Sequence, residues 1–133
     1  MIVLDTHALL WWVNGDTQLS QSALDTITQE LESENGNILM SAITAWEIAL
    51  LVEKERLSLS MSVDDWLETV SDIDGVSFVP LDVATAVEST RLPGAFHKDP
   101  ADRIIVSLAR HLNATLITAD EKISAYRHVR TLW

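Results

Sequence analysis

Short apolar segments alternate with longer amphipathic ones along the whole chain, and this alternation constrains the fold more than any other feature. The apolar segments predict strands at 1–4, 37–40, 76–79 and 114–118, and a short fifth strand at the sheet edge over 128–132. The segments between them predict helices at 6–13, 20–32, 43–55, 62–73, 83–91 and 100–111. Strands that are separated by helices pair in parallel through crossover connections. We therefore predict an α/β, doubly wound fold, with a mostly parallel sheet of four to five strands flanked by helices.

Three helix starts carry specific capping residues. Ser20 precedes an amphipathic segment as an N-cap, and Ser62 with Asp65 resembles a capping box. Asp99 followed by Pro100 combines an N-cap with proline at the first helical position, a strong helix start. These residues locate the helix starts independently of the apolar pattern.

The composition predicts a single domain and excludes several kinds of site. A chain of 133 residues, 47% of them hydrophobic, has the size and core of one domain, which we place at residues 1–133. Because there is no cysteine, any bound metal must be held by oxygen ligands or by the four histidines, which favours Mg²⁺ or Mn²⁺. The four glycines form no dinucleotide-binding or Walker motif, which excludes Rossmann dehydrogenases, kinases and P-loop ATPases.

The net charge of −11, from 20 acidic against 9 basic residues, disfavours broad electrostatic binding of nucleic acid. Cations bound by clustered acids would reverse the field locally. The first residues lack the basic region of a signal peptide, and the apolar runs are shorter than the roughly 20 residues that span a bilayer. We therefore expect a cytoplasmic protein without a membrane segment.

Five acidic residues fall on one edge of the predicted sheet. Asp5 ends the first strand, and Glu47 lies in the early turns of the helix after the second. Asp99 and Asp102 begin the helix before the fourth strand, and Asp120 follows that strand. Strand C-termini and helix N-termini share an edge in such folds, and ligands usually bind there. Crowded carboxylates repel one another, whereas a divalent ion removes that repulsion and assists phosphodiester hydrolysis. The sequence thus predicts a metal site at this edge.

Each aspartate also has a purely structural explanation. Asp5 would start the helix at 6, Asp99 would act as a plain N-cap, and Asp120 would cap a short helix at 121–126. For Asp99 the capping role is the simpler one. Asp102, in a first helical turn, would interact favourably with the helix macrodipole.

Glu47 is harder to explain structurally, because nearly all its neighbours in 43–52 are apolar. A carboxylate in such a segment is rarely buried without a partner. Its partner would be a metal ion, Arg103, or the solvent along an exposed stripe.

The same apolar helix predicts a homodimer, because a helix that is apolar nearly all round needs a second surface, here another subunit. His97 lies beside the predicted site. Arg91, Lys98 and Arg103 bracket the same loop and would contact phosphate, although the simpler expectation is that one of them pairs with a site acid.

Four segments, 2–12, 41–48, 99–105 and 116–120, resemble the motifs of PIN-domain ribonucleases, and within them the VapC-type toxins of bacterial toxin–antitoxin pairs. The resemblance covers essentially the whole chain, in order. It implies a PIN-like domain with Mg²⁺- or Mn²⁺-dependent endoribonuclease activity on RNA, a homodimer, and an antitoxin whose tail occludes the active site.

The resemblance also assigns roles to residues. It implies a catalytic, metal-binding acidic set and small polar residues that order it. The acidic set comprises Asp5, Glu47, Asp102 and Asp120, with Asp99 as an additional acid, and the small polar residues are Thr6, Ser41 and Thr118.

Two other functions stay open. A phosphatase with Asp5 as nucleophile is disfavoured. Such enzymes have an Asp-x-Asp pattern after the first strand, whereas this chain has His7 at the second aspartate position. A non-catalytic PIN-like binding module with a decayed site is disfavoured because the acidic set is intact.

Overall fold

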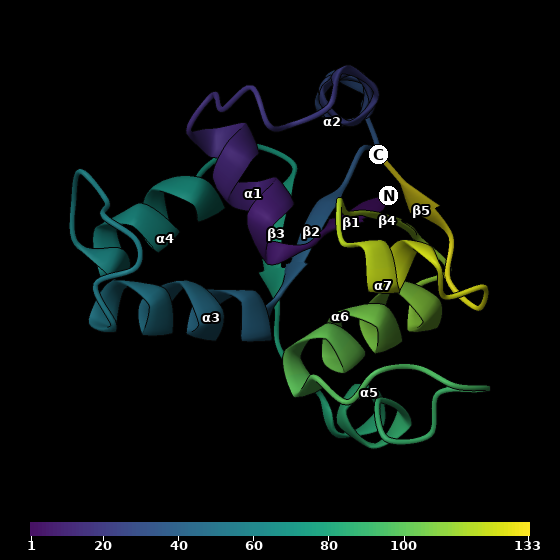
Figure 1. Cartoon of the computed structure of the whole chain (residues 1–133). Helices are drawn as coiled ribbons and strands as arrows, with labels where there is room; N and C mark the ends of the chain where they lie inside the picture. The colour runs from purple at the N-terminus through teal and green to yellow at the C-terminus, as the bar shows by residue number, and fades with distance from the viewer.

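The computed structural model describes all residues from Met1 to Trp133 and contains one five-stranded sheet, of order β3-β2-β1-β4-β5 (Figure 1). All four strand pairings are parallel. The strands are β1 (Ile2–Leu4), β2 (Ile38–Ser41), β3 (Val76–Val79), β4 (Thr115–Ile117) and β5 (Thr131–Leu132). The predicted α/β fold is confirmed, and the fifth strand lies at the sheet edge as expected.

Seven helices connect the strands: α1 (Thr6–Val13), α2 (Gln21–Glu32), α3 (Ala42–Glu53), α4 (Val63–Ser71), α5 (Val83–Glu88), α6 (Pro100–His111) and α7 (Glu121–Ser124). The predicted N-caps are confirmed. The side chains of Ser20, Ser62 and Asp99 each accept a hydrogen bond from the backbone N–H three residues later. None of the seven helices combines the length and apolar character needed to cross a membrane.

The helices α3, α4, α5 and α7 end two or three residues earlier than predicted. The local reasons are clear for α3 and α5. After α3, Glu55 adopts a positive φ of 57°, which stops the helix, and the Arg56 N–H bonds to the Leu51 carbonyl oxygen. After α5, the hydroxyls of Ser89 and Thr90 donate to carbonyl oxygens of the last turn. Such side chains satisfy backbone groups without continuing the helix.

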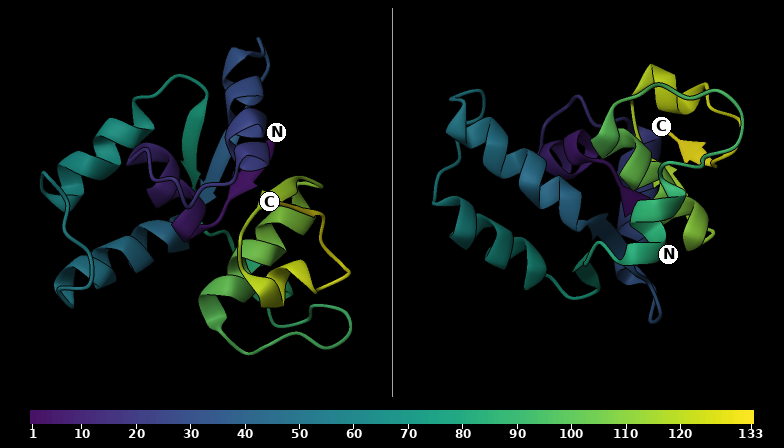
Figure 2. Two further views of the ribbon diagram at one scale, coloured as in Figure 1. Left: turned by 45° about the horizontal axis from the view of Figure 1, so that its top comes forward. Right: turned by 90° about the horizontal axis from the view of Figure 1, so that it is seen from below.

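Helices cover both faces of the sheet (Figure 2). The central strand β1 is therefore buried on both sides. Ile2 and Leu4 of β1 belong to a core that includes residues of α1 to α4, whereas Val3 belongs to a second core with residues of α6 and α7. The alternation follows the two-residue period of a strand. The two cores thus pack α1 to α4 on one face of the sheet and α6 and α7 on the other.

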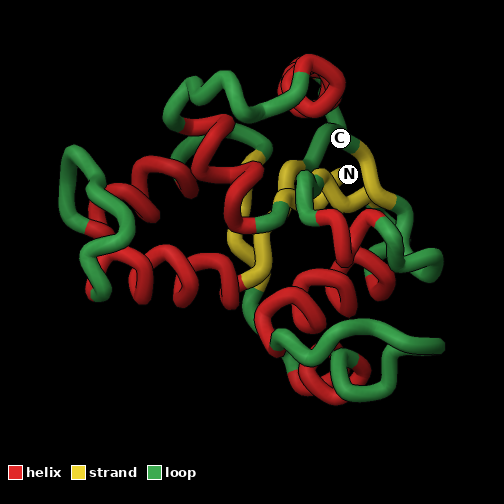
Figure 3. The backbone as a smooth tube through the Cα atoms, viewed as in Figure 1, coloured by secondary structure: helices red, strands yellow, loops and turns green.

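The carboxyl end of the sheet is where the site is assembled. α1 follows β1 directly and α3 follows β2 directly, so the N-termini of both helices lie at that edge (Figure 1). The loop of residues 89–99 connects α5 to α6 and runs beside these two helices (Figure 3).

α3 is incompletely covered within one chain. Only Thr44 and Ile48 of this helix are buried, and the Trp46 side chain is 55% exposed. An uncovered apolar face is what a dimer interface would need, and the homodimer stays a prediction.

Candidate active site

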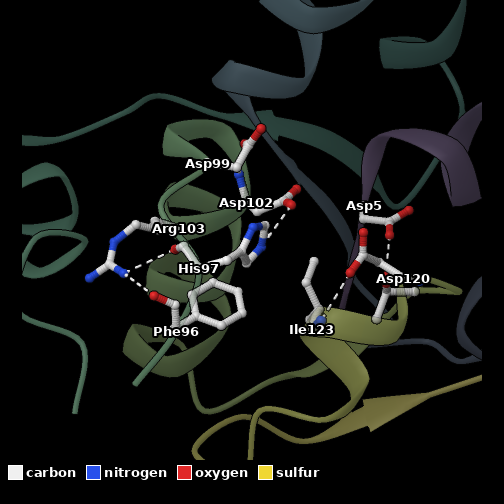
Figure 4. Close-up of polar contacts among 9 residues, drawn as sticks. Asp5, Phe96, His97, Asp99, Asp102, Arg103, Asp120 and Ile123 are labelled. Carbon is white, nitrogen blue, oxygen red and sulfur yellow. Dashed lines mark hydrogen bonds and ion pairs between the residues drawn. The ribbon is translucent and has the colours of Figure 1, made fainter. Parts of the chain in front are cut away.

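The structure brings all five predicted acids to one cavity of about 400 Å³, although they come from four separate segments of the chain. Figure 4 shows Asp102 on one side of this site and Asp5 and Asp120 on the other. The lining residues are Asp5, Thr6, His7, Trp11, Glu47, Asp99, Asp102, Ile105, Ala119 and Asp120. Parallel strands and direct strand-to-helix connections account for Asp5, Glu47 and Asp120. The loop of residues 89–99 brings Asp99 and Asp102 to the same edge.

Asp5 is buried and held at both carboxylate oxygens. It is the N-cap of α1, where Oδ1 accepts a hydrogen bond of 2.8 Å from the Ala8 N–H, while Oδ2 accepts one from the Thr118 hydroxyl. Burial raises the pKa of Asp5 above its usual range. Asp5 therefore starts α1 as expected, and its two hydrogen bonds orient the carboxylate toward the cavity.

Glu47 lies on the second turn of α3, and its nearest partner is a hydroxyl rather than a cation. Its Oε1 accepts a hydrogen bond of 2.6 Å from Thr6 Oγ1, which itself lies 3.2 Å from Thr44 Oγ1. Burial raises the pKa of Glu47. Thr6 comes directly after Asp5, so one short segment both supplies one site acid and orients another.

Asp99 and Asp102 occupy the start of α6. Asp99 Oδ1 accepts the Asp102 N–H at 3.0 Å, so Asp99 is an N-cap, as its structural explanation required. Burial, and after it the negative charges of the neighbouring carboxylates, raise the pKa of Asp102 to about 7. These carboxylates are those of Asp99, Asp120, Glu47 and Asp5. Asp102 is thus the acid on which the crowding of the site acts most.

Asp120 follows β4 and caps α7, where its Oδ1 accepts the Ile123 N–H at 3.0 Å (Figure 4). Its own N–H donates to Thr118 Oγ1 at 3.0 Å. Because the Thr118 hydroxyl also donates to Asp5, this one threonine ties the two acids together. Three of the five acids are therefore helix caps, but capping explains neither Glu47 nor Asp102.

None of the five acids is paired with a lysine or arginine. The expectation that Arg91, Lys98 or Arg103 pairs with a site acid is wrong. Arg103 donates to backbone carbonyl oxygens instead, and Arg91 lies 4.0 Å from Glu88. Successive residues of a helix point about 100° apart, so Arg103 faces the loop while Asp102 faces the cavity.

The residues fit a divalent cation by their chemistry. The site offers carboxylate oxygens, which suit hard ions, and leaves their charge without a cationic partner. No three acidic or histidine side chains, as they stand, surround one point closely enough to hold an ion by themselves. An ion would therefore bind to one or two carboxylates directly and to the others through water, as Mg²⁺ commonly does.

The apolar part of the cavity was not predicted. Trp11 and Ile105 contribute to its wall, and the rings of Trp11 and His7 lie 5.7 Å apart. Residues four apart share one face of a helix. The spacing of His7 and Trp11 after Asp5 was therefore a signal in the sequence that they border the same site.

Comparison with known proteins identifies the family of the chain. A model of the PIN domain matches residues 2–129. The chain belongs to the PIN-domain family. A PIN-family relative, Ribonuclease VapC22 of Mycobacterium tuberculosis (strain ATCC 25618 / H37Rv), is 34% identical over 135 residues, which cover 99% of this chain and 98% of the relative. The predicted resemblance to VapC-type PIN proteins is confirmed.

Solved structures share the PIN fold. VapBC2 from Rickettsia felis, crystallised with a DNA fragment from its promoter, matches with a TM-score of 0.71 at 18% identity, over 99% of this chain and 98% of that chain. A toxin–antitoxin complex from Klebsiella pneumoniae matches with a TM-score of 0.65 at 17% identity, over 97% and 95% of the two chains. At these identities the likeness establishes the fold alone.

Proposed function

We propose that this PIN-domain protein is a metal-dependent endoribonuclease that acts as the toxin of a toxin–antitoxin pair. One observation carries the proposal: five carboxylates from four segments line one cavity, and no lysine or arginine pairs with them. The relative that is 34% identical is named a ribonuclease, which supports RNA as the substrate.

In this mechanism Asp5, Glu47 and Asp102 would hold a first Mg²⁺ or Mn²⁺ ion, directly or through water. Asp120 would serve a second, weaker site or orient the attacking water, and Asp99, which caps α6, would offer an additional ligand position. When bound, a divalent ion supplies Lewis acidity, which lowers the pKa of water and offsets charge on the phosphate.

The remaining side chains keep the acids in place before substrate binds. Thr118 and the Ala8 N–H hold the two oxygens of Asp5, and Thr6 holds Oε1 of Glu47. Hydrogen bonds from neighbouring groups orient ligands and raise the precision of a metal site. The net charge of −11 disfavours RNA binding, and cations held by the clustered acids would reverse the field locally.

The partners follow from the same proposal. A cognate antitoxin would silence the enzyme by placing a cationic side chain among the unpaired carboxylates. The toxin–antitoxin complex from Klebsiella pneumoniae, which shares the fold, supports such a partner. A homodimer would cover the exposed face of α3 around Trp46. A cytoplasmic location stays part of the proposal.

The decisive experiment is cleavage of total cellular RNA by the purified, antitoxin-free protein with Mg²⁺ or Mn²⁺, with EDTA, and with two variants. Asp5→Asn removes the charge but retains capping ability, because asparagine is also a good N-cap. Asp64→Asn removes an exposed charge on α4, away from the cavity, as the matched control.

We expect discrete cuts that require metal, disappear in Asp5→Asn and persist in Asp64→Asn. If the wild type cuts no RNA with either metal, the nuclease proposal fails. The absence of a ready-made three-ligand metal site would then favour a non-catalytic binding module.

A further inference from the structure

Asp102 differs from the other acids of the cavity, because no hydrogen bond holds its carboxylate. Backbone N–H groups hold Asp5, Asp99 and Asp120, and a hydroxyl holds Glu47. The closest polar side chain to Asp102 is His97, whose Nε2 lies 3.1 Å from Asp102 Oδ2 (Figure 4). A metal ligand without an orienting partner would be free to adopt several rotamers.

The Nε2 atom of His97 is itself unusual. It is buried, and no group lies in good hydrogen-bond alignment with it, although the Asp102 oxygen is within reach. Buried polar atoms in native proteins nearly always have a partner, so an unpartnered one needs an explanation. A small rotation of the Asp102 carboxylate would align the two groups and satisfy both.

Arg103 fixes the position of His97 from the opposite side. Its Nε donates to the Ser89 carbonyl oxygen at 2.9 Å, and its Nη1 lies 3.2 Å from the carbonyl oxygens of both Phe96 and His97. The guanidinium also lies 6.0 Å from the centre of the Phe96 ring. The planar, spread fork of donors of an arginine reaches carbonyl oxygens of two loop segments, a geometry that the compact ammonium group of lysine does not reproduce.

Aromatic packing restrains the same loop. The Phe96 ring meets the His97 ring edge to face at 4.5 Å and lies 4.6 Å from the ring of Tyr126. The Tyr126 hydroxyl donates to the Pro93 carbonyl oxygen. The loop of residues 89–99 has no helix or strand of its own, and these contacts hold it against the site.

We propose that His97 is a positioning residue for Asp102, and that Arg103 holds His97 in place through the loop backbone. In this arrangement the Nε2–H of His97 donates to Asp102 Oδ2 and leaves Oδ1 directed at the divalent ion. The inference rests on the proposed function, in which Asp102 is a metal ligand. It explains why an arginine next to this ligand binds carbonyl oxygens rather than the acids.

The first test measures Mn²⁺ binding to the full chain by calorimetry. His97→Leu removes the donor, whereas His97→Gln keeps an N–H donor near the position of Nε2. We expect His97→Leu to weaken Mn²⁺ binding 10- to 100-fold, the usual effect of losing an outer hydrogen-bond partner, and His97→Gln to recover most of it. Arg103→Lys should also weaken binding.

Two control variants on α6 make the same kinds of substitution away from the cavity. Arg110→Lys changes an arginine of α6 that also donates to a loop carbonyl, that of His128, but lies outside the cavity. His111→Leu removes an exposed histidine at the end of α6. Neither should alter Mn²⁺ affinity. Melting temperatures recorded in EDTA separate a change in the fold from a change in the site.

Wild-type Mn²⁺ affinity in His97→Leu would overturn the inference. The inference would also be overturned if His97→Leu and His97→Gln lost Mn²⁺ affinity equally and in parallel with their melting temperatures. His97 would then only fill space.

A nitrogen NMR spectrum of the His97 ring, recorded without metal, separates this inference from the proposed function. If the wild type neither binds Mn²⁺ nor cuts RNA, the proposed function fails. The contact is then tested alone: Asp102→Asn must shift the Nε2 resonance, and an unchanged resonance overturns the inference.

Discussion

Replacing Asp102 with asparagine should stabilise the metal-free protein while it abolishes metal-dependent activity. Burial, together with the carboxylates of Asp99 and Asp120, raises the pKa of Asp102 to about 7, from an ordinary 3.8. The folded state therefore binds this proton more tightly than the unfolded state does. Between pH 3.8 and 7 the free energy of unfolding falls as the pH rises, and the penalty is complete above pH 7.

The size of the effect follows from that pKa. A move from 3.8 to about 7 corresponds to about 4 kcal/mol. The side chain is 24% exposed, so solvent screening reduces this to roughly 2 kcal/mol. Loss of the negative charge from the first turn of α6 opposes the gain by about 0.5 kcal/mol. We expect a net gain of about 1.5 kcal/mol at pH 8, or about 6 °C in melting temperature for a domain of this size.

The assay is thermal and urea unfolding in EDTA at pH 8 and pH 5, with Asp64→Asn as an exposed control. More than half of the gain should be lost at pH 5, where Asp102 of the wild type is largely protonated. Saturating Mn²⁺ should reverse the order, because an ion at about 100 times its dissociation constant adds about 2.7 kcal/mol to a protein that binds it. A variant less stable than the wild type at pH 8 in EDTA, or a gain that is equal at both pH values, would refute the reasoning.

Three further predictions concern the same site and the proposed subunit interface. Thr118→Val should destabilise the fold by about 1–2 kcal/mol and lower the cleavage rate at saturating RNA at least tenfold. The reason is that Asp5 and the Asp120 N–H lose their shared partner. An unchanged cleavage rate would contradict this role of Thr118. The apparent affinity for Mn²⁺, measured by calorimetry, should fall about tenfold for each pH unit below 7, because a proton competes for Asp102; a flat profile between pH 5 and 7 contradicts it. Trp46→Lys should shift the protein toward monomer in sedimentation experiments without loss of secondary structure; a protein that is monomeric before the change removes the dimer.

Much of the site could be predicted because it depends on local sequence and on topology. Asp99 and Pro100 start α6 by capping and by a preset φ, which require no distant contact. Parallel strands joined by helices place every strand end that leads into a helix on the same edge. This rule predicts that Asp5, Glu47 and Asp120 meet, and all three line the cavity.

The side-chain partners could not be predicted in the same way. Thr118 and Asp5 are 113 residues apart, and they meet only because β4 pairs with β1. Arg103 was expected near the acids, but its direction on α6 and the path of the loop sent it to three carbonyl oxygens. The sequence by itself determined the elements, their caps and the edge at which the acids meet, because those depend on short-range chemistry and chain connectivity. Only the tertiary structure decided which hydroxyl, imidazole or carbonyl each charged group faces, because that depends on the packing of segments far apart in the chain.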